Sequence, residues 1–180
     1  MLTFLFHVIK DIILILVCAI GLPIYGICVL LLLTIGKIFD ISYIDASVYV
    51  CEYGQPIVTA VAAIVVAVYC IKYSRGLNNT RLFLIWSIIL SNLAITGYSL
   101  SSLLMRINQY KGLTNRQIFN TVVDKLNKIG EGFIPGNFDC FGYEKISYGY
   151  VMANIEAYIL PISLVILLFI IARKWILYQS

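Results

Sequence analysis

Charged residues are scarce in this chain of 180 residues, because Asp, Glu, Lys and Arg together make up only 12% of it. A water-soluble domain carries about 25% charged residues, most of them on its surface. Hydrophobic residues reach 61%, more than a soluble domain of this size has room to bury. The composition therefore argues against a free-standing soluble domain and indicates a protein dissolved in a lipid bilayer.

The side-chain patterns that enzymes use are also missing from the sequence. The single histidine, His7, lies in a short apolar segment near the N-terminus, before the first long apolar run. No His, Cys or carboxylate cluster has the spacing of metal ligands. Neither a glycine-rich phosphate loop nor a nucleophile motif occurs. We therefore expect no catalysis and no bound cofactor or metal. The net charge of +4 is small and spread out, so we expect no direct contact with nucleic acid.

Four long apolar runs dominate what is present, at Ile12 to Gly36, Tyr53 to Ile71, Leu82 to Met105 and Tyr150 to Ala172. Crossing the hydrocarbon of a bilayer takes ~20 apolar residues, with every backbone N–H and C=O paired inside its own segment. The short alternating strands of a membrane barrel do not appear. The sequence therefore predicts an all-α polytopic membrane protein, with four transmembrane helices in a single domain over residues 1–180.

The distribution of Lys and Arg predicts the orientation of these helices. The basic residues of one side lie in short flanks close to the helix ends, at Lys10, Lys72, Arg75, Arg81, Arg173 and Lys174. Most basic residues of the other side lie in a longer loop between the third and fourth runs, where the positive-inside bias is weaker. We therefore expect both termini in the cytoplasm and the two larger loops outside, in a bacterial inner membrane.

The longer outer loop contains the clearest helix signal outside the apolar runs. Thr114 followed by Gln117 is a capping-box pattern, and apolar residues then recur at helical spacing as far as Ile129. Gly130 stands where a glycine cap would end the helix. The pattern predicts an amphipathic helix over about 115–129. Its apolar stripe would cover the top of the bundle, the bilayer surface or a partner protein.

Polar residues inside the runs are the candidate functional positions, because amides and charges are costly in hydrocarbon. The third run contains Ser91 and Asn92, and the fourth contains Asn154 and Glu156. For Glu156 we favour contact with water, Asn154 or a tyrosine over a role in an ion path. On the third run one face carries polar side chains, and we expect it to point toward protein: Ser87, Ser91, Tyr98 and Ser102.

Two further patterns concern packing and cross-linking. Thr59, Ala63 and Ala67 recur every four residues in the second run, and small residues at this spacing predict a helix-packing seam. Cys51 and Cys140 lie in the two loops assigned to the same side. They are expected either to form a disulfide, if that side is oxidising, or to stay as two thiols.

In size and layout the whole chain resembles the membrane subunit of the Kiwa anti-phage defence system, which has four spans, cytoplasmic termini and a longer second outer loop. The resemblance implies an oligomeric membrane sensor that works with a cytoplasmic DNA-binding effector. It also implies that the outer loops sense disturbance of the envelope. The effector would then contact a set of basic residues: Lys72, Arg75, Arg81, Arg173 and Lys174.

Two alternative functions remain open at this point. The chain has the length and the spans of immunity proteins against pore-forming toxins, and would then bind the toxin's hydrophobic hairpin through the polar face of the third run. It would otherwise be a small channel or transporter built by self-association, with Glu156 and Asn154 around its mouth. Each alternative predicts a protein that functions through contacts in the bilayer.

Overall fold

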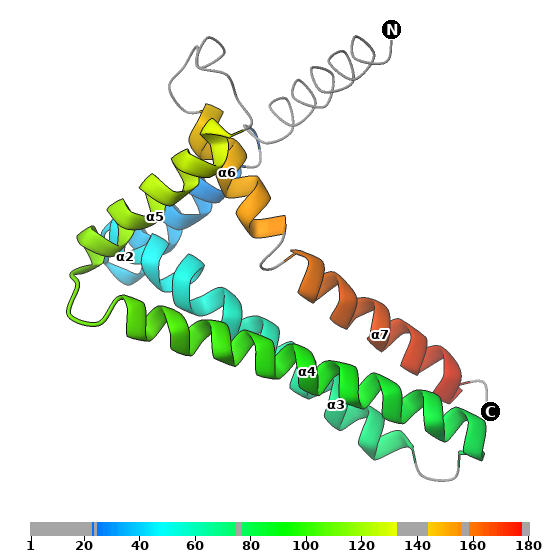
Figure 1. Cartoon of the computed structure of the whole chain (residues 1–180). Coiled ribbons are helices and arrows are strands. Elements are labelled where there is room, and N and C mark those ends of the chain that lie inside the picture. The colour runs from blue at the N-terminus through cyan, green and yellow to red at the C-terminus, as the bar shows by residue number, and fades with distance from the viewer. Residues whose placement is uncertain (1–22, 24, 75–76, 133–143, 156–158, 178–180) are drawn as a thin grey trace, which may run out of the picture. The chain divides into compact units, whose positions relative to one another are not determined.

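The computed structural model describes residues 23, 25–74, 77–132, 144–155 and 159–177. Every regular element in these ranges is a helix, and no strand occurs among them (Figure 1). After an apolar helix at Tyr25–Phe39, the elements are α2 (Tyr43–Ser47), η1 (Val48–Gly54), α3 (Gln55–Tyr73), α4 (Asn79–Gln109), α5 (Asn115–Glu131), α6 (Glu144–Asn154) and α7 (Leu160–Leu177). The all-helical class predicted from the sequence is therefore confirmed.

Two of the helices in the described ranges are long and apolar enough to cross a membrane. The first runs without a break over Tyr43–Tyr73 and joins α2, η1 and α3, and the second is α4. These helices contain the second and third runs predicted from the sequence, but each extends beyond its run. The first predicted span lies partly outside the described residues, and the part that is described belongs to the helix Tyr25–Phe39.

The fourth predicted span, residues 150–172, is described only in part. Its beginning lies in α6 (Glu144–Asn154) and its remainder in α7, which begins at Leu160. Residues 155 and 159 are both helical, in the wider π form, and residues 156–158 lie outside the described residues. Whether this part of the chain forms one membrane span stays a prediction.

The chain forms two compact units. Unit 1 comprises Met1–Val48 and Gly112–Ile155, and unit 2 comprises Tyr49–Lys111 and Glu156–Ser180. The main chain passes from one unit to the other after Val48, after Lys111 and after Ile155. At Gly112 a positive φ of 81° suits glycine because it has no Cβ.

In unit 1 the predicted loop helix is present as α5, with the predicted capping box. The Thr114 hydroxyl accepts from the Gln117 N–H, and the Gln117 side chain accepts from the Thr114 N–H. The apolar stripe of α5 is covered by α2 and α6. On the α2 side, the rings of Tyr43 and Phe119 pack edge to face at 5.9 Å, and Asn115 Nδ2 donates to Asp45 Oδ1 at 2.6 Å.

Gly130 does not cap α5, as the sequence pattern suggested, because the helix continues to Glu131 and its cap is Gly132. Gly130 is instead buried against α6, where a Cβ would overlap the backbone carbonyl of Lys145. Gly149 of α6 lies in the same way against the carbonyl of Leu126. These two glycines let the backbones of α5 and α6 come into direct contact.

In unit 2, α3 and α4 lie side by side as a hairpin, and α7 packs against both (Figure 1). The Asn78 side chain caps α4 by accepting from the Arg81 N–H at 3.1 Å. The apolar core of the unit lies near the turn between α3 and α4, and its buried members are Ala63, Val66, Ala67, Cys70, Ile85, Ile88, Ile89, Val165 and Ala172. The other half of the hairpin positions the polar residues of the candidate site.

Candidate functional site

The charged residues of unit 2 lie only at the ends of its helices. No Asp, Glu, Lys or Arg occurs in residues 53–71, 82–105 or 159–172. A helix of 31 residues is about 46 Å long at 1.5 Å per residue, whereas the hydrocarbon core of a bilayer is ~30 Å thick. Both long helices are therefore longer than the hydrocarbon core is thick, and each has a long uncharged middle.

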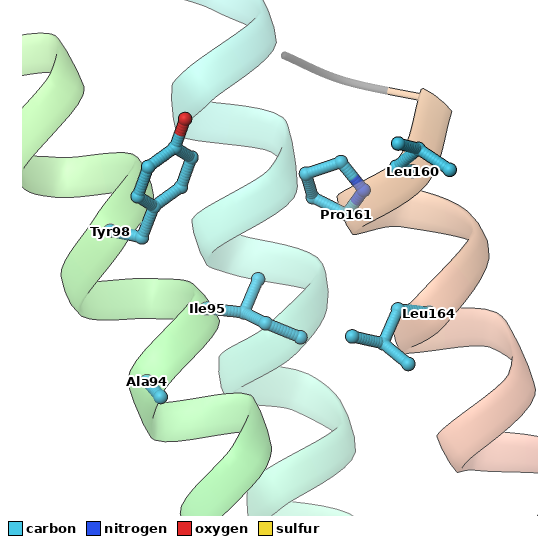
Figure 2. Close-up of a pocket in the computed structure, with 6 residues that line it drawn as sticks. All are labelled: Ala94, Ile95, Tyr98, Leu160, Pro161 and Leu164. Atoms are coloured by element: carbon cyan, nitrogen blue, oxygen red, sulfur yellow. The ribbon is translucent and has the colours of Figure 1, made fainter. Parts of the chain in front are cut away.

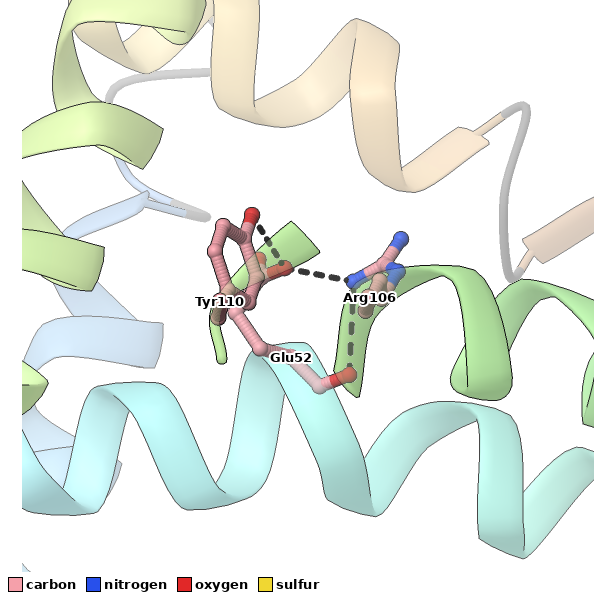
Figure 3. Close-up of polar contacts among 3 residues, drawn as sticks. All are labelled: Glu52, Arg106 and Tyr110. Atoms are coloured by element: carbon pink, nitrogen blue, oxygen red, sulfur yellow. Dashed lines mark hydrogen bonds and ion pairs between the residues drawn. The ribbon is translucent and has the colours of Figure 1, made fainter. Parts of the chain in front are cut away.

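At the end far from the hairpin turn, Glu52, Arg106 and Tyr110 form one polar cluster (Figure 3). Arg106 Nη1 lies 2.8 Å from Glu52 Oε2, and the Tyr110 hydroxyl donates to the same oxygen at 3.2 Å. The side chains of Glu52 and Arg106 are only 12% and 21% exposed. The cluster ties the beginning of the α3 region to the end of α4, and we refer to it below as the Glu52 cluster.

The backbone carbonyl of Glu52 belongs to the same cluster. Glu52 lies in η1, which is a π-helix, where a carbonyl accepts from the N–H five residues later. Pro56 has no N–H that could bond this carbonyl in the α-helical pattern. Arg106 Nη1 reaches the carbonyl oxygen at 3.4 Å. A single guanidinium thus contacts both the carboxylate and the backbone carbonyl of Glu52.

Tyr110 is 8% exposed, and its environment favours the neutral phenol. Burial raises the pKa of Tyr110 to about 12, with further contributions from the negative charge of Glu52 and from the hydrogen bond to it, while the charge of Arg106 acts in the opposite direction. The phenol therefore remains a hydrogen-bond donor to Glu52 throughout the physiological pH range. The chemistry of the cluster is that of a structural ion pair with a neutral donor beside it.

A row of buried polar side chains lies between the Glu52 cluster and the apolar core. It consists of Thr59 on α3 and Asn92, Thr96 and Ser99 on α4, each no more than 9% exposed. On α4 these residues follow one another at intervals of three and four, so they share one face. We call them the polar row.

The predicted polar face of the third run is exposed in the single chain at Ser87, Ser91 and Tyr98, whereas Asn92 beside it is fully buried. That the exposed face points toward protein, in its own bundle or in another copy, stays a prediction. The hydroxyls of Ser87 and Ser91 donate to carbonyls of their own helix, four residues earlier, and so they need no partner from another helix. Because the buried stripe of α4 passes through Asn92, Thr96 and Ser99, the neighbouring serines are turned away from α3.

The other residues that the sequence analysis named as candidates lie outside the Glu52 cluster and, apart from Thr59, outside the polar row. Thr59, Ala63 and Ala67 of the predicted seam are all buried on α3. Asn154 lies at the end of α6 in unit 1, where its Nδ2 donates to the Tyr150 carbonyl at 2.7 Å. Glu156 and Cys140 lie outside the described residues. Cys51 lies half-buried in η1, so a disulfide with Cys140 stays a prediction.

At the turn end of unit 2, basic side chains come together from three helices. Lys72 lies at the end of α3, Arg81 in the first turn of α4, and Arg173 and Lys174 near the end of α7. Tyr69 of α3 packs against Phe169 of α7 with ring centroids 5.2 Å apart, which brings these helix ends together. Arg75 lies outside the described residues. We call Lys72, Arg81, Arg173 and Lys174 the basic end.

Along one side of unit 2, α4 and α7 enclose a groove of about 380 Å³ (Figure 2). Its lining is apolar apart from the Tyr98 hydroxyl, and it is formed by Ala94, Ile95, Tyr98, Leu160, Pro161 and Leu164. Tyr98 is 60% exposed. The groove therefore offers an apolar surface with one hydrogen-bonding group.

Sequence reasoning did not find the Glu52 cluster, although a signal for it was present. Glu52 immediately precedes the predicted second span, and Arg106 immediately follows the predicted third span. Because consecutive spans run in opposite directions, these two residues are expected at the same end of the predicted helix pair. Opposite charges at such positions, followed by Pro56, favour the pairing that the structure shows.

No known protein family, curated protein or solved structure matches this chain.

Proposed function

We propose that the chain is an integral protein of a bacterial inner membrane that crosses the bilayer four times, with both termini in the cytoplasm. The observation that carries this proposal is the separation of charge in unit 2. Two helices longer than the bilayer is thick have uncharged middles, and such a segment is stable across hydrocarbon.

The basic end supports the proposed orientation. Lys72, Arg81, Arg173 and Lys174 lie together at one end of unit 2, and no acidic residue occurs in residues 53–123 or 157–180. Short segments rich in Lys and Arg are retained on the cytoplasmic side. The hairpin turn and the end of α7 therefore face the cytoplasm, and the Glu52 cluster lies at the outer surface.

Reporter fusions test this topology directly. A reporter that is active only in the cytoplasm should function after Ser180 and within the hairpin turn at 74–78. A reporter that is active only outside should function within 40–42 and 133–143. The reverse pattern would contradict the orientation, and any other number of crossings would contradict the four spans.

Within the membrane the protein acts without catalysis, through contacts with other proteins, as an oligomeric sensor or anchor subunit of an anti-phage defence complex. Support comes from the resemblance of the predicted layout to that of the Kiwa membrane subunit and from the basic end, which offers an acidic cytoplasmic effector a compact set of charges. Unit 1 supplies the sensing part, because α5 presents a charged and polar face beyond the stripe that α2 and α6 cover.

Purification in a mild detergent tests the sensor proposal. Light scattering should give the mass of a homo-oligomer, and affinity capture from cells should recover a cytoplasmic partner. The variant Lys72→Glu with Arg173→Glu and Lys174→Glu should lose the partner but keep the oligomer. Lys111→Glu, at the other end of unit 2, is the matched control. A monomer that captures no partner would contradict the proposal.

The groove between α4 and α7 favours immunity against a pore-forming toxin as a second candidate function. Tyr98 is exposed within the groove, and Ser87 and Ser91 are exposed on the same helix. A hydrophobic toxin hairpin would find there an apolar surface with polar groups for its own backbone. Tyr98→Leu should then reduce protection of cells from a toxin encoded beside this gene, whereas Leu90→Ala, elsewhere on α4, should not.

A further inference from the structure

Asn92 of the polar row has one side-chain atom whose environment is incomplete. The residue is fully buried, and its Nδ2 donates to the Ile88 carbonyl at 2.9 Å. Its Oδ1 is buried too, and nothing in the described part of the chain donates a hydrogen bond to it. Exchanging the two atoms by rotation of the amide would place a donor where Oδ1 now lies, and the need for a partner would remain.

The neighbouring hydroxyls of the polar row do not supply this missing donor. Thr59 Oγ1 donates its proton to the Gln55 carbonyl at 3.0 Å, and Thr96 Oγ1 donates to the Asn92 carbonyl at 2.9 Å. Each hydroxyl has only one proton to give but can still accept. Thr59 and Thr96 therefore have free acceptor capacity and no proton left to donate to Asn92 Oδ1.

Buried polar atoms in native proteins are nearly always satisfied, by protein or by an ordered water molecule. A water molecule is the small ligand with two donors, and buried waters typically bridge polar groups of this kind. The residues around the polar row are small, since Ala60 and Ala63 are buried on α3 beside Thr59. Small side chains leave room that a leucine or an isoleucine would fill.

We propose that a water molecule binds between α3 and α4 and donates one hydrogen bond to Asn92 Oδ1. Its second proton reaches a hydroxyl oxygen of the polar row, on Thr59 or Thr96. Water enters from the side of the Glu52 cluster, where Ser99 continues the row. On the other side the apolar core, with Val66, Ile85 and Ile89, blocks its passage.

This hydrated site has a consequence for transport. A polar row that meets a polar cluster at one end and an apolar core at the other offers water a place to stay but no route across. The α3–α4 interface of a single chain is therefore a hydrated seam and not a conducting path. The inference depends only on the packing of α3 against α4, and it holds whichever partner the protein has.

Nuclear magnetic resonance of the full-length chain, ¹⁵N-labelled in deuterated detergent, tests this site. The protons on Asn92 Nδ2 should show a cross-peak to water, and Asn92→Leu should remove this signal while the backbone spectrum stays folded. Ser91→Ala, at the exposed neighbouring position, is the matched control and should leave the cross-peak unchanged. A folded protein without a water cross-peak at Asn92 would overturn the proposal.

Exchanging hydroxyl protons can also carry magnetisation from water to the amide, so the measurement is repeated in Thr59→Val and in Thr96→Val. A bound water contacts Asn92 directly, and the cross-peak should then survive in at least one of these variants. Loss of the cross-peak in both would assign it to the hydroxyls and overturn the bound water. These outcomes are independent of oligomer formation and partner binding, so they leave the proposed function unaffected.

Discussion

In the two halves of the α3–α4 hairpin, the helices are held together by different interactions. Near the turn, the buried residues are aliphatic or small, such as Ala67, Cys70 and Ile85. Far from the turn, they include the polar row, which is followed by the Glu52 cluster. One pair of helices thus has an apolar half and a polar half, which adjoin where Thr59 and Asn92 lie beside the apolar core.

For the proposed membrane protein, the difference indicates what each half contributes to the helix pair. Apolar packing in a bilayer gives close contact, but it does not separate protein from water and so provides little preference for one register. A polar interaction is satisfied in one register only, because a shift of either helix leaves an amide or a charge unpaired. We infer that the apolar half provides contact and that the polar half fixes the register of α3 against α4.

The largest effect should come from breaking the ion pair of the polar half. Arg106→Leu leaves the carboxylate and the backbone carbonyl of Glu52 without the donor that now serves both. Removing one partner of a buried ion pair costs several kcal/mol, and here we expect a loss of about 3 kcal/mol, since both side chains keep some exposure. Unfolding of the purified protein in mixed detergent, followed by circular dichroism, measures it.

The matched control for this prediction is Lys111→Leu. Lys111 is exposed and lies five residues after Arg106, so its substitution should change the free energy of unfolding by less than about 0.5 kcal/mol. If both leucine variants were equally stable, the Glu52 cluster would contribute no specific interaction and the contrast between the two halves would disappear.

Alkaline pH should weaken the polar half through Tyr110. The pKa of its phenol is raised to about 12 in the folded chain, above the value of about 10 in an unfolded chain. The folded state therefore holds this proton more tightly. Its contribution to stability is complete below pH 10 and is lost as the pH rises toward 12.

The expected loss from Tyr110 is about 2 kcal/mol over this interval, somewhat less than two units of pKa would give, because the phenol is close to the surface. Other groups also titrate above pH 10, so the measurement is the difference between the unmodified chain and Tyr110→Phe. The phenylalanine variant should have the shallower decline in unfolding free energy between pH 10 and 12. Parallel curves would show that Tyr110 has no special environment.

The sequence predicted the helical class and the approximate place of the long helices, because uninterrupted apolar runs have few alternatives to a helix in lipid. The capping box at Thr114 and Gln117 was also predicted, since it depends on neighbouring residues alone. Such features are local. Gly130 was misassigned for the opposite reason, because its contact with Lys145 of α6 comes from a different part of the chain.

The polar half was only partly predictable. A helical period alone does not tell which of two adjacent polar residues is buried, and so Ser91 and Asn92 were both candidates. The packing of α3 decides between them, in favour of Asn92. The Glu52 cluster joins residues more than fifty positions apart, and its recognition requires the pairing of two helices that periodicity does not provide.

In the apolar half, a cavity should have a moderate effect. Ile85 is fully buried in the core near the turn, and Ile85→Ala should cost about 2 kcal/mol, at the low end of the range for soluble cores. The cost is smaller because exposing this surface to lipid is not penalised as it is in water. Leu90→Ala, at a position 63% exposed, is the control and should cost less than about 0.5 kcal/mol. A larger loss from Ile85→Ala than from Arg106→Leu would reverse the ranking of the two halves.

The smallest effect should come from Pro56→Ala, which tests why Arg106 contacts the Glu52 carbonyl. An alanine N–H at position 56 lets this carbonyl be bonded in the α-helical pattern in place of the π-helical one of η1, so one of the two contacts of Arg106 becomes redundant. The cost of Arg106→Leu should therefore be lower in the Pro56→Ala background by about 0.5–1 kcal/mol, the value of one hydrogen bond. A double-mutant cycle with the same unfolding assay measures this coupling. Additive effects would show that the 3.4 Å contact contributes nothing, and the carboxylate alone would then account for the polar half.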